Sequence, residues 1–252
     1  MLGENAAKAK LAAGQISVGC QAMLVHPMVV ELIGRAGFDW VLFDGEHGPL
    51  TPESVELGTI AAENVGLTPI ARVPVNRPEV ILRFMDTGLA GVLVPHVDTA
   101  DDAEAAVRAV KYHPRGERGL AGVRASGYGA RPIAEYIEHA NRQTMVLAMI
   151  ESAASVENIE KIAAVDGIDV LNVGQSDLSQ SMGKPGRRDD PEVRAAVERV
   201  IEVGTKAGKA VAVGSGPSSE WPGWRDKGVT WFGTNVIELI LSSGRQIAGS
   251  VR

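Results

Sequence analysis

Short apolar runs alternate with longer amphipathic segments along most of the chain. The runs are rich in valine, isoleucine and leucine, which is typical of strands buried on both faces. We predict strands at residues 16–24, 39–44, 68–74, 91–97, 144–151, 169–175, 210–216 and 230–235. The amphipathic segments predict helices at residues 27–35, 51–65, 78–86, 99–112, 132–141, 156–165 and 191–207, several of them followed by a glycine that ends the helix.

Regular alternation of strands and helices predicts a parallel sheet, because parallel strands need a crossover connection. Eight strands are the number that closes a barrel, and 252 residues are an ordinary length for one. We therefore expect a single (β/α)8 TIM-barrel domain over residues 1–252. A doubly wound open sheet is the alternative, but the turn from Met23 to Pro27 lacks a glycine-rich dinucleotide fingerprint.

One segment interrupts this rhythm. Residues 113–131 are rich in glycine and arginine and form a loop longer than most connections in a compact domain. Long loops are usually functional or disordered. We expect the functional case, with the arginines lying beside an acidic mouth of the barrel.

Composition narrows the classes of partner. The formal net charge is −6 with both signs interspersed, and no basic stripe carries interleaved aromatics, so we expect no nucleic-acid binding. Cys20 is the single cysteine, which excludes an internal disulfide and fits a small core residue in a reducing compartment. No apolar run reaches the roughly 18 residues of a membrane span, and the first residues lack a signal-peptide pattern. A soluble cytoplasmic protein is the expectation.

In such a barrel the chemistry lies at the carboxyl ends of the strands. The second strand is the most informative, because its apolar residues end in Asp44, Glu46 and His47, which cannot all be buried without partners. The remaining polar candidates at strand ends are Arg72, His96, Glu151, Ser176, Asp177, Ser215, Ser218, Thr234 and Asn235.

Glu151 and Asp177 predict a metal site. Two carboxylates on neighbouring strand ends, together with substrate oxygens and water, suit Mg²⁺ or Mn²⁺. Each residue also has a structural alternative. Asp177 is three residues before Gln180 and could cap a helix in a capping box, and Glu151 could simply pair with an arginine.

His47 is the candidate general base, because its unperturbed pKa lies nearest neutrality. A hydrogen-bonded structural histidine is the alternative. Arg72 interrupts an apolar strand, which indicates that it meets an anion, either a substrate or Asp44 or Glu46 in a structural ion pair. His96 has no distinctive spacing, and a packing role is one interpretation of it.

The positions of the lysines bear on whether a Schiff-base mechanism is possible. All eight of them fall on predicted helices or loops and none on a strand end: Lys8, Lys10, Lys111, Lys161, Lys184, Lys206, Lys209 and Lys227. A Schiff-base mechanism needs a desolvated amine in the mouth. Carbonyl chemistry in this protein would therefore have to be metal-assisted.

Five segments, in this order along the chain, resemble the HpcH/HpaI aldolase family of metal-dependent class II pyruvate aldolases: residues 38–49, 93–97, 112–119, 149–152 and 173–179. The resemblance implies a (β/α)8 barrel whose last helix is exchanged between subunits, in hexamers built from dimers. It implies reversible cleavage of 4-hydroxy-2-oxo acids to pyruvate and an aldehyde through a metal-bound pyruvate enolate. Mg²⁺ or Mn²⁺ is the expected cofactor, with Co²⁺ or Zn²⁺ also possible.

Carried over by position, the resemblance implies His47 as base and Arg72 as the residue that stabilises the transition state and contacts substrate. It implies Glu151 and Asp177 as metal ligands, Ser176 with Asp177 as substrate contacts, and Asp86 as the acid that raises the basicity of the histidine. Asp44 and Glu46 would then order water and contacts around His47.

The chain departs from the family pattern at Met149, where many members carry glutamine. A polar side chain expected to contact the pyruvyl unit is thereby replaced. Two other functions stay open: an acyl-CoA lyase like the citrate-lyase relatives, with the arginine-rich loop as nucleotide cleft, and a metal- or metabolite-binding barrel without catalysis.

Overall fold

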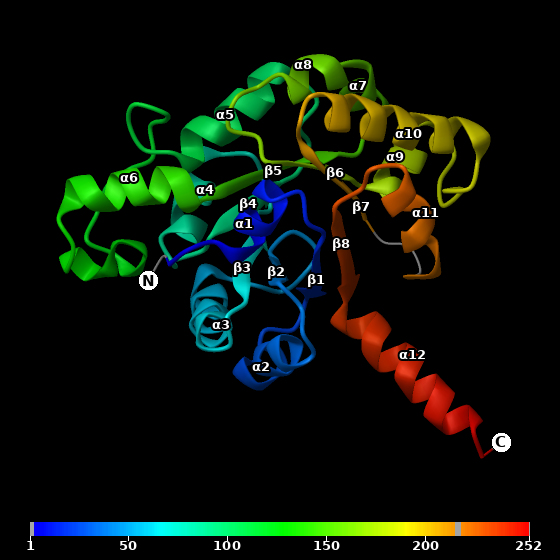
Figure 1. Ribbon diagram of the computed structural model, residues 1–252, viewed down its shortest axis with the longest axis horizontal. Helices are drawn as coiled ribbons and strands as arrows, with labels where there is room; N and C mark the ends of the chain where they lie inside the picture. Colours follow the sequence, from blue (N-terminus) through cyan, green and yellow to red (C-terminus); the bar gives the residue numbers. More distant parts are fainter. Residues whose placement is uncertain (1–2, 215–217, 252) are drawn as a thin grey trace.

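The computed structural model describes residues 3–214 and 218–251 and shows eight parallel strands closed into a barrel (Figure 1). Neighbours in the chain are neighbours in the sheet, and β1 closes the barrel by pairing with β8. The strands are β1 Ser17–Ala22, β2 Trp40–Asp44, β3 Thr68–Arg72, β4 Gly91–Val94, β5 Met145–Ile150, β6 Val170–Val173, β7 Ala210–Val213 and β8 Trp231–Asn235. The predicted (β/α)8 class is confirmed, while the candidate Ser215 lies outside the described residues.

Helices follow the strands around the outside of the barrel (Figure 1). The α-helices are α1 Ala6–Ala12, α2 Pro27–Arg35, α3 Pro52–Asn64, α4 Pro78–Met85, α5 Ala100–Val110, α6 Ile133–Gln143, α7 Ala153–Glu157, α8 Ile159–Ala163, α9 Gln175–Ser181, α10 Pro191–Lys206, α11 Trp221–Asp226 and α12 Val236–Gly249, and the 3-10 helices are η1 Arg124–Gly129 and η2 Ser218–Glu220. Thr51 and Thr99 cap α3 and α5, each in a capping box, because the threonine hydroxyl satisfies a backbone amide of the first turn.

The helix predicted over residues 156–165 is instead two short helices, α7 and α8, that meet at Asn158. The Asn158 side chain donates to the carbonyl oxygens of Asp98 at 3.0 Å and Ala154 at 3.1 Å. Asparagine side chains compete with the helix ladder for backbone partners in this way. The hydrophobic period continues through the break, so the pattern alone did not reveal it.

The predicted sixth strand was too long at its carboxyl end. β6 ends at Val173, and α9 begins at Gln175 with Gly174 as its N-cap. Ser176 and Asp177 consequently lie in the first turn of a helix. The interpretation of Asp177 as an N-cap with Gln180 is therefore wrong.

The barrel lumen is filled by side chains. Its apolar cluster consists mainly of inward-facing strand residues: Ala7, Trp40, Leu42, Ile70, Leu93, Met145, Leu147, Met149, Val170, Ala212 and Trp231. The Trp40 and Trp231 rings are stacked, with centroids 4.6 Å apart. Glycine is required at Gly19 and Gly233, because a Cβ there would come within 1.9 Å and 2.7 Å of the Trp40 ring. A packed lumen confines any chemistry to the barrel mouth.

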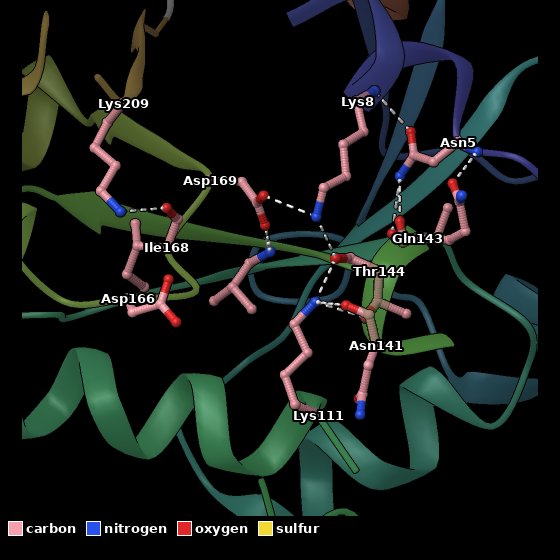
Figure 2. A network of polar contacts seen from close by, with 12 residues as sticks. Asn5, Lys8, Lys111, Asn141, Gln143, Thr144, Asp166, Ile168, Asp169 and Lys209 are labelled. Carbon is pink, nitrogen blue, oxygen red and sulfur yellow. Dashed lines mark hydrogen bonds and ion pairs between the residues drawn. The ribbon is translucent and has the colours of Figure 1, made fainter. Parts of the chain in front are cut away.

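A polar network covers the amino ends of β5 and β6 (Figure 2). Lys111 Nζ donates to the carbonyl oxygens of Asn141 at 3.0 Å and Thr144 at 2.6 Å, and to Thr144 Oγ1 at 3.0 Å. Lys8 pairs with Asp169 at 3.0 Å. Burial, helped by the nearby charge of Lys8, lowers the pKa of Lys111 to about 7. This lysine belongs to the floor of the barrel, opposite the mouth.

The arginine-rich loop, residues 113–131, joins α5 to α6 and so lies on the side of the barrel where helices return to strands. Arg118 pairs with Asp86 at 2.8 Å, and Arg124 pairs with Glu63 at 2.6 Å. Both arginines are buried. The expectation that this loop lines the acidic mouth is wrong, because a connection that follows a helix reaches the amino ends of the strands.

Helix α12 extends away from the barrel (Figure 1). Its first residue, Val236, is buried, but Ile237, Ile240 and Ile247 are 49%, 63% and 72% exposed. Exposed apolar surface of this kind marks an interaction site. Among the residues that the structure describes, no helix has the length and apolar character needed to cross a membrane.

Candidate functional site

Arg72 and Asp44 form a two-pronged ion pair at the carboxyl ends of β3 and β2. The two residues are register partners, so their side chains emerge side by side. Arg72 Nε donates to Asp44 Oδ1 at 2.9 Å and Arg72 Nη2 to Asp44 Oδ2 at 2.6 Å. Both side chains are buried. The structural ion pair considered for Arg72 is therefore present, and its contact with substrate stays a prediction.

Asp44 also fixes the loop that follows β2. Its Oδ1 accepts from the backbone amides of Glu46 and His47, each at 3.1 Å, and its Oδ2 accepts from Gln21 Nε2 at 2.6 Å. Burial alone would raise the pKa of Asp44, but the hydrogen bond and charge of Arg72 lower it overall. Gln21 was not among the residues predicted for the site, although its place near the end of β1 marks it as a polar strand-end residue.

His47 lies in this loop with an exposed side chain. Its backbone is held by Asp44, but within residues 3–214 and 218–251 no hydrogen bond or ion pair is found for its ring. The hydrogen-bonded structural role is thus not observed among the described residues. An exposed imidazole at the mouth fits a general base, which stays a prediction.

Glu151 follows β5 and is buried, with His96 as its partner. Its Oε1 accepts the backbone amide of His96 at 2.8 Å and lies 3.2 Å from His96 Nδ1. Glu46 Oε1 lies 3.8 Å from Nε2 of the same ring. The alternative in which Glu151 pairs with an arginine is therefore not what the structure shows.

The packing interpretation of His96 is wrong. Its side chain is 70% exposed, and its contacts are with carboxylates. Its backbone is left-handed, with φ at 53°, an unusual state for a residue with a side chain. That conformation aims the amide at Glu151. The position at a strand end was visible in the sequence, whereas the backbone state was not.

Negative charge at the mouth exceeds the available positive charge. Burial raises the pKa of Glu151, and the charges of Glu46 and Asp177 raise it further, against the lowering effect of His96. Arg72 is already engaged by Asp44, and its Nη1 lies 3.0 Å from Glu46 Oε2. That oxygen is buried, and among the described residues no hydrogen-bond donor is found for it. A cation is the species that would relieve this excess.

The residues present fit a divalent cation bound through two carboxylates. Asp177 is exposed in the first turn of α9, and its charge acts on Glu151 across the junction of β5 and β6. Among the described residues, no group of three or more histidine, cysteine or acidic side chains is arranged to hold a metal. Glu151 and Asp177 would leave the remaining coordination positions to water and substrate oxygens, as Mg²⁺ and Mn²⁺ prefer.

The two remaining predicted site residues, Ser176 and Asp86, lie at opposite ends of the barrel. Ser176 is exposed next to Asp177 in α9, at the mouth. Asp86 ends α4 at the opposite end of the barrel, where it pairs with Arg118. Within one chain the structure does not bring Asp86 and His47 together.

The structure agrees with the sequence-based arguments against a reactive thiol and against a Schiff-base lysine. Cys20 is fully buried, and burial raises the pKa of its thiol to about 12, which confirms the core interpretation. In the described part of the chain, no lysine lies at the carboxyl end of a strand. An amine for Schiff-base chemistry is thus missing from the mouth that these residues form.

Comparisons of the sequence with known proteins give one family. A family model described as HpcH/HpaI aldolase/citrate lyase matches residues 18–216. A 5-keto-4-deoxy-D-glucarate aldolase of Shigella boydii serotype 18 is 37% identical over 206 residues, which cover 81% of this chain and 79% of that protein.

Two solved structures are similar to this chain over nearly its whole length. An HpcH/HpaI aldolase/citrate lyase family protein from Burkholderia cenocepacia J2315 is 33% identical, with a TM-score of 0.93 over 98% of this chain and 99% of that one. The citrate synthase SbnG is 30% identical, with a TM-score of 0.88 over 98% of each chain.

Proposed function

The chain belongs to the HpcH/HpaI aldolase/citrate lyase family and is therefore an aldolase-type carbon–carbon lyase, and we propose that it reversibly cleaves 4-hydroxy-2-oxo acids to pyruvate and an aldehyde. The observation that carries the proposal is the buried Glu151 carboxylate, whose pKa is raised by burial and by the charges of Glu46 and Asp177. A site that concentrates negative charge beside an arginine suits a cation and an anionic oxo acid together.

Glu151 and Asp177 would hold the divalent cation, with Mg²⁺ or Mn²⁺ as the metals of choice. The cation would supply the Lewis acidity that makes the C3 protons of pyruvate removable near neutral pH. In this proposal His47 takes a proton from C3. Arg72 donates to the oxygen on which negative charge develops, and Asp44 keeps its guanidinium in place.

Ser176 and Asp177 begin α9 and would contact the carboxylate end of the substrate. The relative from Shigella boydii is named for 5-keto-4-deoxy-D-glucarate, which is itself a 4-hydroxy-2-oxo acid when counted from its keto end. Its cleavage yields pyruvate and tartronate semialdehyde. We take this pair as the first substrates to assay.

The two competing functions are less well supported. An acyl-CoA lyase would need a basic cleft at the mouth, yet the arginine-rich loop joins α5 to α6 and commits Arg118 and Arg124 to Asp86 and Glu63. A barrel without catalysis would rest on Met149 alone. The base, the arginine and both carboxylates speak against it.

The deciding experiment is a panel of pyruvate with tartronate semialdehyde, succinic semialdehyde, lactaldehyde or glyceraldehyde. We expect condensation with Mg²⁺ or Mn²⁺, complete loss of activity with a chelator, and recovery when the metal is returned. Deuterium exchange at C3 of pyruvate should show the same metal dependence. Full activity after chelation, or cleavage of CoA thioesters alone, would exclude the proposal.

We further propose a homo-oligomer in the cytoplasm, in which α12 packs against another copy. Its exposed apolar residues need cover, and further apolar residues are exposed on α2 and α3, among them Met28, Leu32 and Leu57. A hexamer is the state implied by the resemblance. Asp86 would serve His47 from a neighbouring copy, because the two lie at opposite ends of their own barrel.

Mixed oligomers test this arrangement. His47→Ala and Asp86→Asn should each be inactive, but coexpressed protomers should regain aldolase activity, because one site then combines an intact histidine with an intact aspartate. The control is a mixture of His47→Ala with Glu151→Gln. His47 and Glu151 lie at the mouth of the same barrel, so every site in this mixture keeps one defect and the mixture should stay inactive. If Asp86 acts within its own chain, the first mixture stays inactive.

A further inference from the structure

Asn172 is a polar residue in an otherwise apolar layer of the lumen. It lies on β6 and is the register partner of Met149 on β5. Val170, two residues earlier on the same strand, belongs to the lumen cluster, as does Met149. Because residues two apart share a face, the Asn172 amide points into the barrel.

This amide has few partners in the protein. Its Nδ2 lies 2.9 Å from Met149 Sδ, and in the described part of the chain no other hydrogen bond is found for its side chain. A thioether is a weak acceptor, and a primary amide has a second N–H and a carbonyl oxygen to satisfy. Asn172 is only half-buried, so a ligand at the mouth can reach it.

Two glycines lie beside the Glu151 carboxylate and the Asn172 amide. A Cβ at Gly174 would lie 3.2 Å from Glu151 Oε2 and 3.5 Å from Met149 Sδ, so the carboxylate and the sulfur face the same small volume. A Cβ at Gly214 would lie 3.8 Å from Asn172 Nδ2. The residue that follows β6 and the residue that follows β7 thus place no side chain against the Glu151 carboxylate or the Asn172 amide.

We propose that Asn172 is a substrate-binding residue whose side-chain amide donates a hydrogen bond to the carboxylate of the bound 2-oxo acid from the lumen side. The inference rests on the proposed aldolase function and deepens it. Met149 occupies the place where the family pattern has an amide, and Asn172 brings an amide to the same layer from the neighbouring strand.

The test measures binding of oxalate and pyruvate by calorimetry with saturating Mn²⁺. Asn172→Val and Asn172→Ala should weaken binding about 10- to 100-fold, the range expected for a lost hydrogen bond to a charged group. KM for pyruvate should rise more than kcat falls, and Mn²⁺ affinity without ligand should stay unchanged. Met149→Leu, which removes the sulfur but keeps the amide, is the matched control and should bind like the wild type.

Moving the amide back provides a rescue. In Met149→Gln/Asn172→Val the amide returns to β5 at the register partner, and most of the lost oxalate affinity should return. Oxalate binding by both Asn172 variants at wild-type strength would overturn the inference, as would a double variant no better than Asn172→Val. Absence of aldol cleavage in the wild type would instead refute the proposed function, while oxalate binding would still report on Asn172.

Discussion

Glu151→Gln should abolish metal-stimulated proton exchange at C3 of pyruvate, with a loss of at least about 10³-fold, because the Lewis acidity of a bound cation is worth several kcal/mol. Glutamine preserves the shape and can still accept the His96 amide that now meets Oε1 at 2.8 Å. It removes the negative charge and replaces one carboxylate oxygen by an NH2 group. Exchange is followed by nuclear magnetic resonance in deuterium oxide, and Mn²⁺ affinity by electron paramagnetic resonance.

Glu46→Gln is the matched comparison for this variant. Glu46 contributes negative charge to the same site, but it is paired with Arg72 and is not a proposed ligand. Its substitution should weaken Mn²⁺ binding less than Glu151→Gln does. Equal losses in both variants would mean that the mouth attracts the cation through its overall charge, and surviving exchange in Glu151→Gln would remove Glu151 from the metal site.

Asp44→Asn should cost about 3–5 kcal/mol of stability, the range for breaking a buried ion pair from one side. The variant leaves the buried Arg72 without its carboxylate and weakens the bonds to the amides of Glu46 and His47. Activity should fall with stability, because Arg72 and His47 both lose their anchor. Denaturation by urea and steady-state kinetics measure the two effects.

The pH dependence of that loss has a definite sign. The folded-state pKa of Asp44 is lowered, so its ionised form stabilises the fold above the unfolded pKa of about 3.9. The stability difference between wild type and Asp44→Asn should be fully present above about pH 4 and shrink as pH falls through the lower folded pKa. Asp189→Asn breaks an exposed aspartate–arginine pair and should cost much less stability than Asp44→Asn, because solvent screens that pair. Equal losses in the two variants would contradict the structural role of Asp44.

The strand–helix alternation was predictable because its signals are local. Apolar runs, threonine caps and terminal glycines each act within a few residues, and the order of elements then determined which residues meet at the mouth. Asp44, Arg72 and Glu151 were found in this way. The position of the arginine-rich loop was predictable in the same way, because a loop that follows a helix lies at the amino ends of the strands. It was placed at the mouth because its arginines suggested a partner for the acidic residues there.

What sequence reasoning missed depends on tertiary contacts. The left-handed backbone of His96 has no marker in its residue type. The break at Asn158 depends on a carbonyl of Asp98, far away in the sequence. Asn172 became informative only when the register placed it beside Met149. In each case a long-range neighbour decides the role of a residue whose local pattern is ordinary.

The stacked indoles of Trp40 and Trp231 are a spectroscopic probe of barrel closure. They belong to β2 and β8, on either side of β1, and Gly19 of β1 leaves the room in which their rings meet. The first and last thirds of the chain must therefore be joined before the rings can stack. Coupling between the two chromophores can be followed by near-ultraviolet circular dichroism or fluorescence. Its appearance during refolding would report when β1 pairs with β8. This pairing joins distant parts of the chain, and non-local contacts of this kind slow folding.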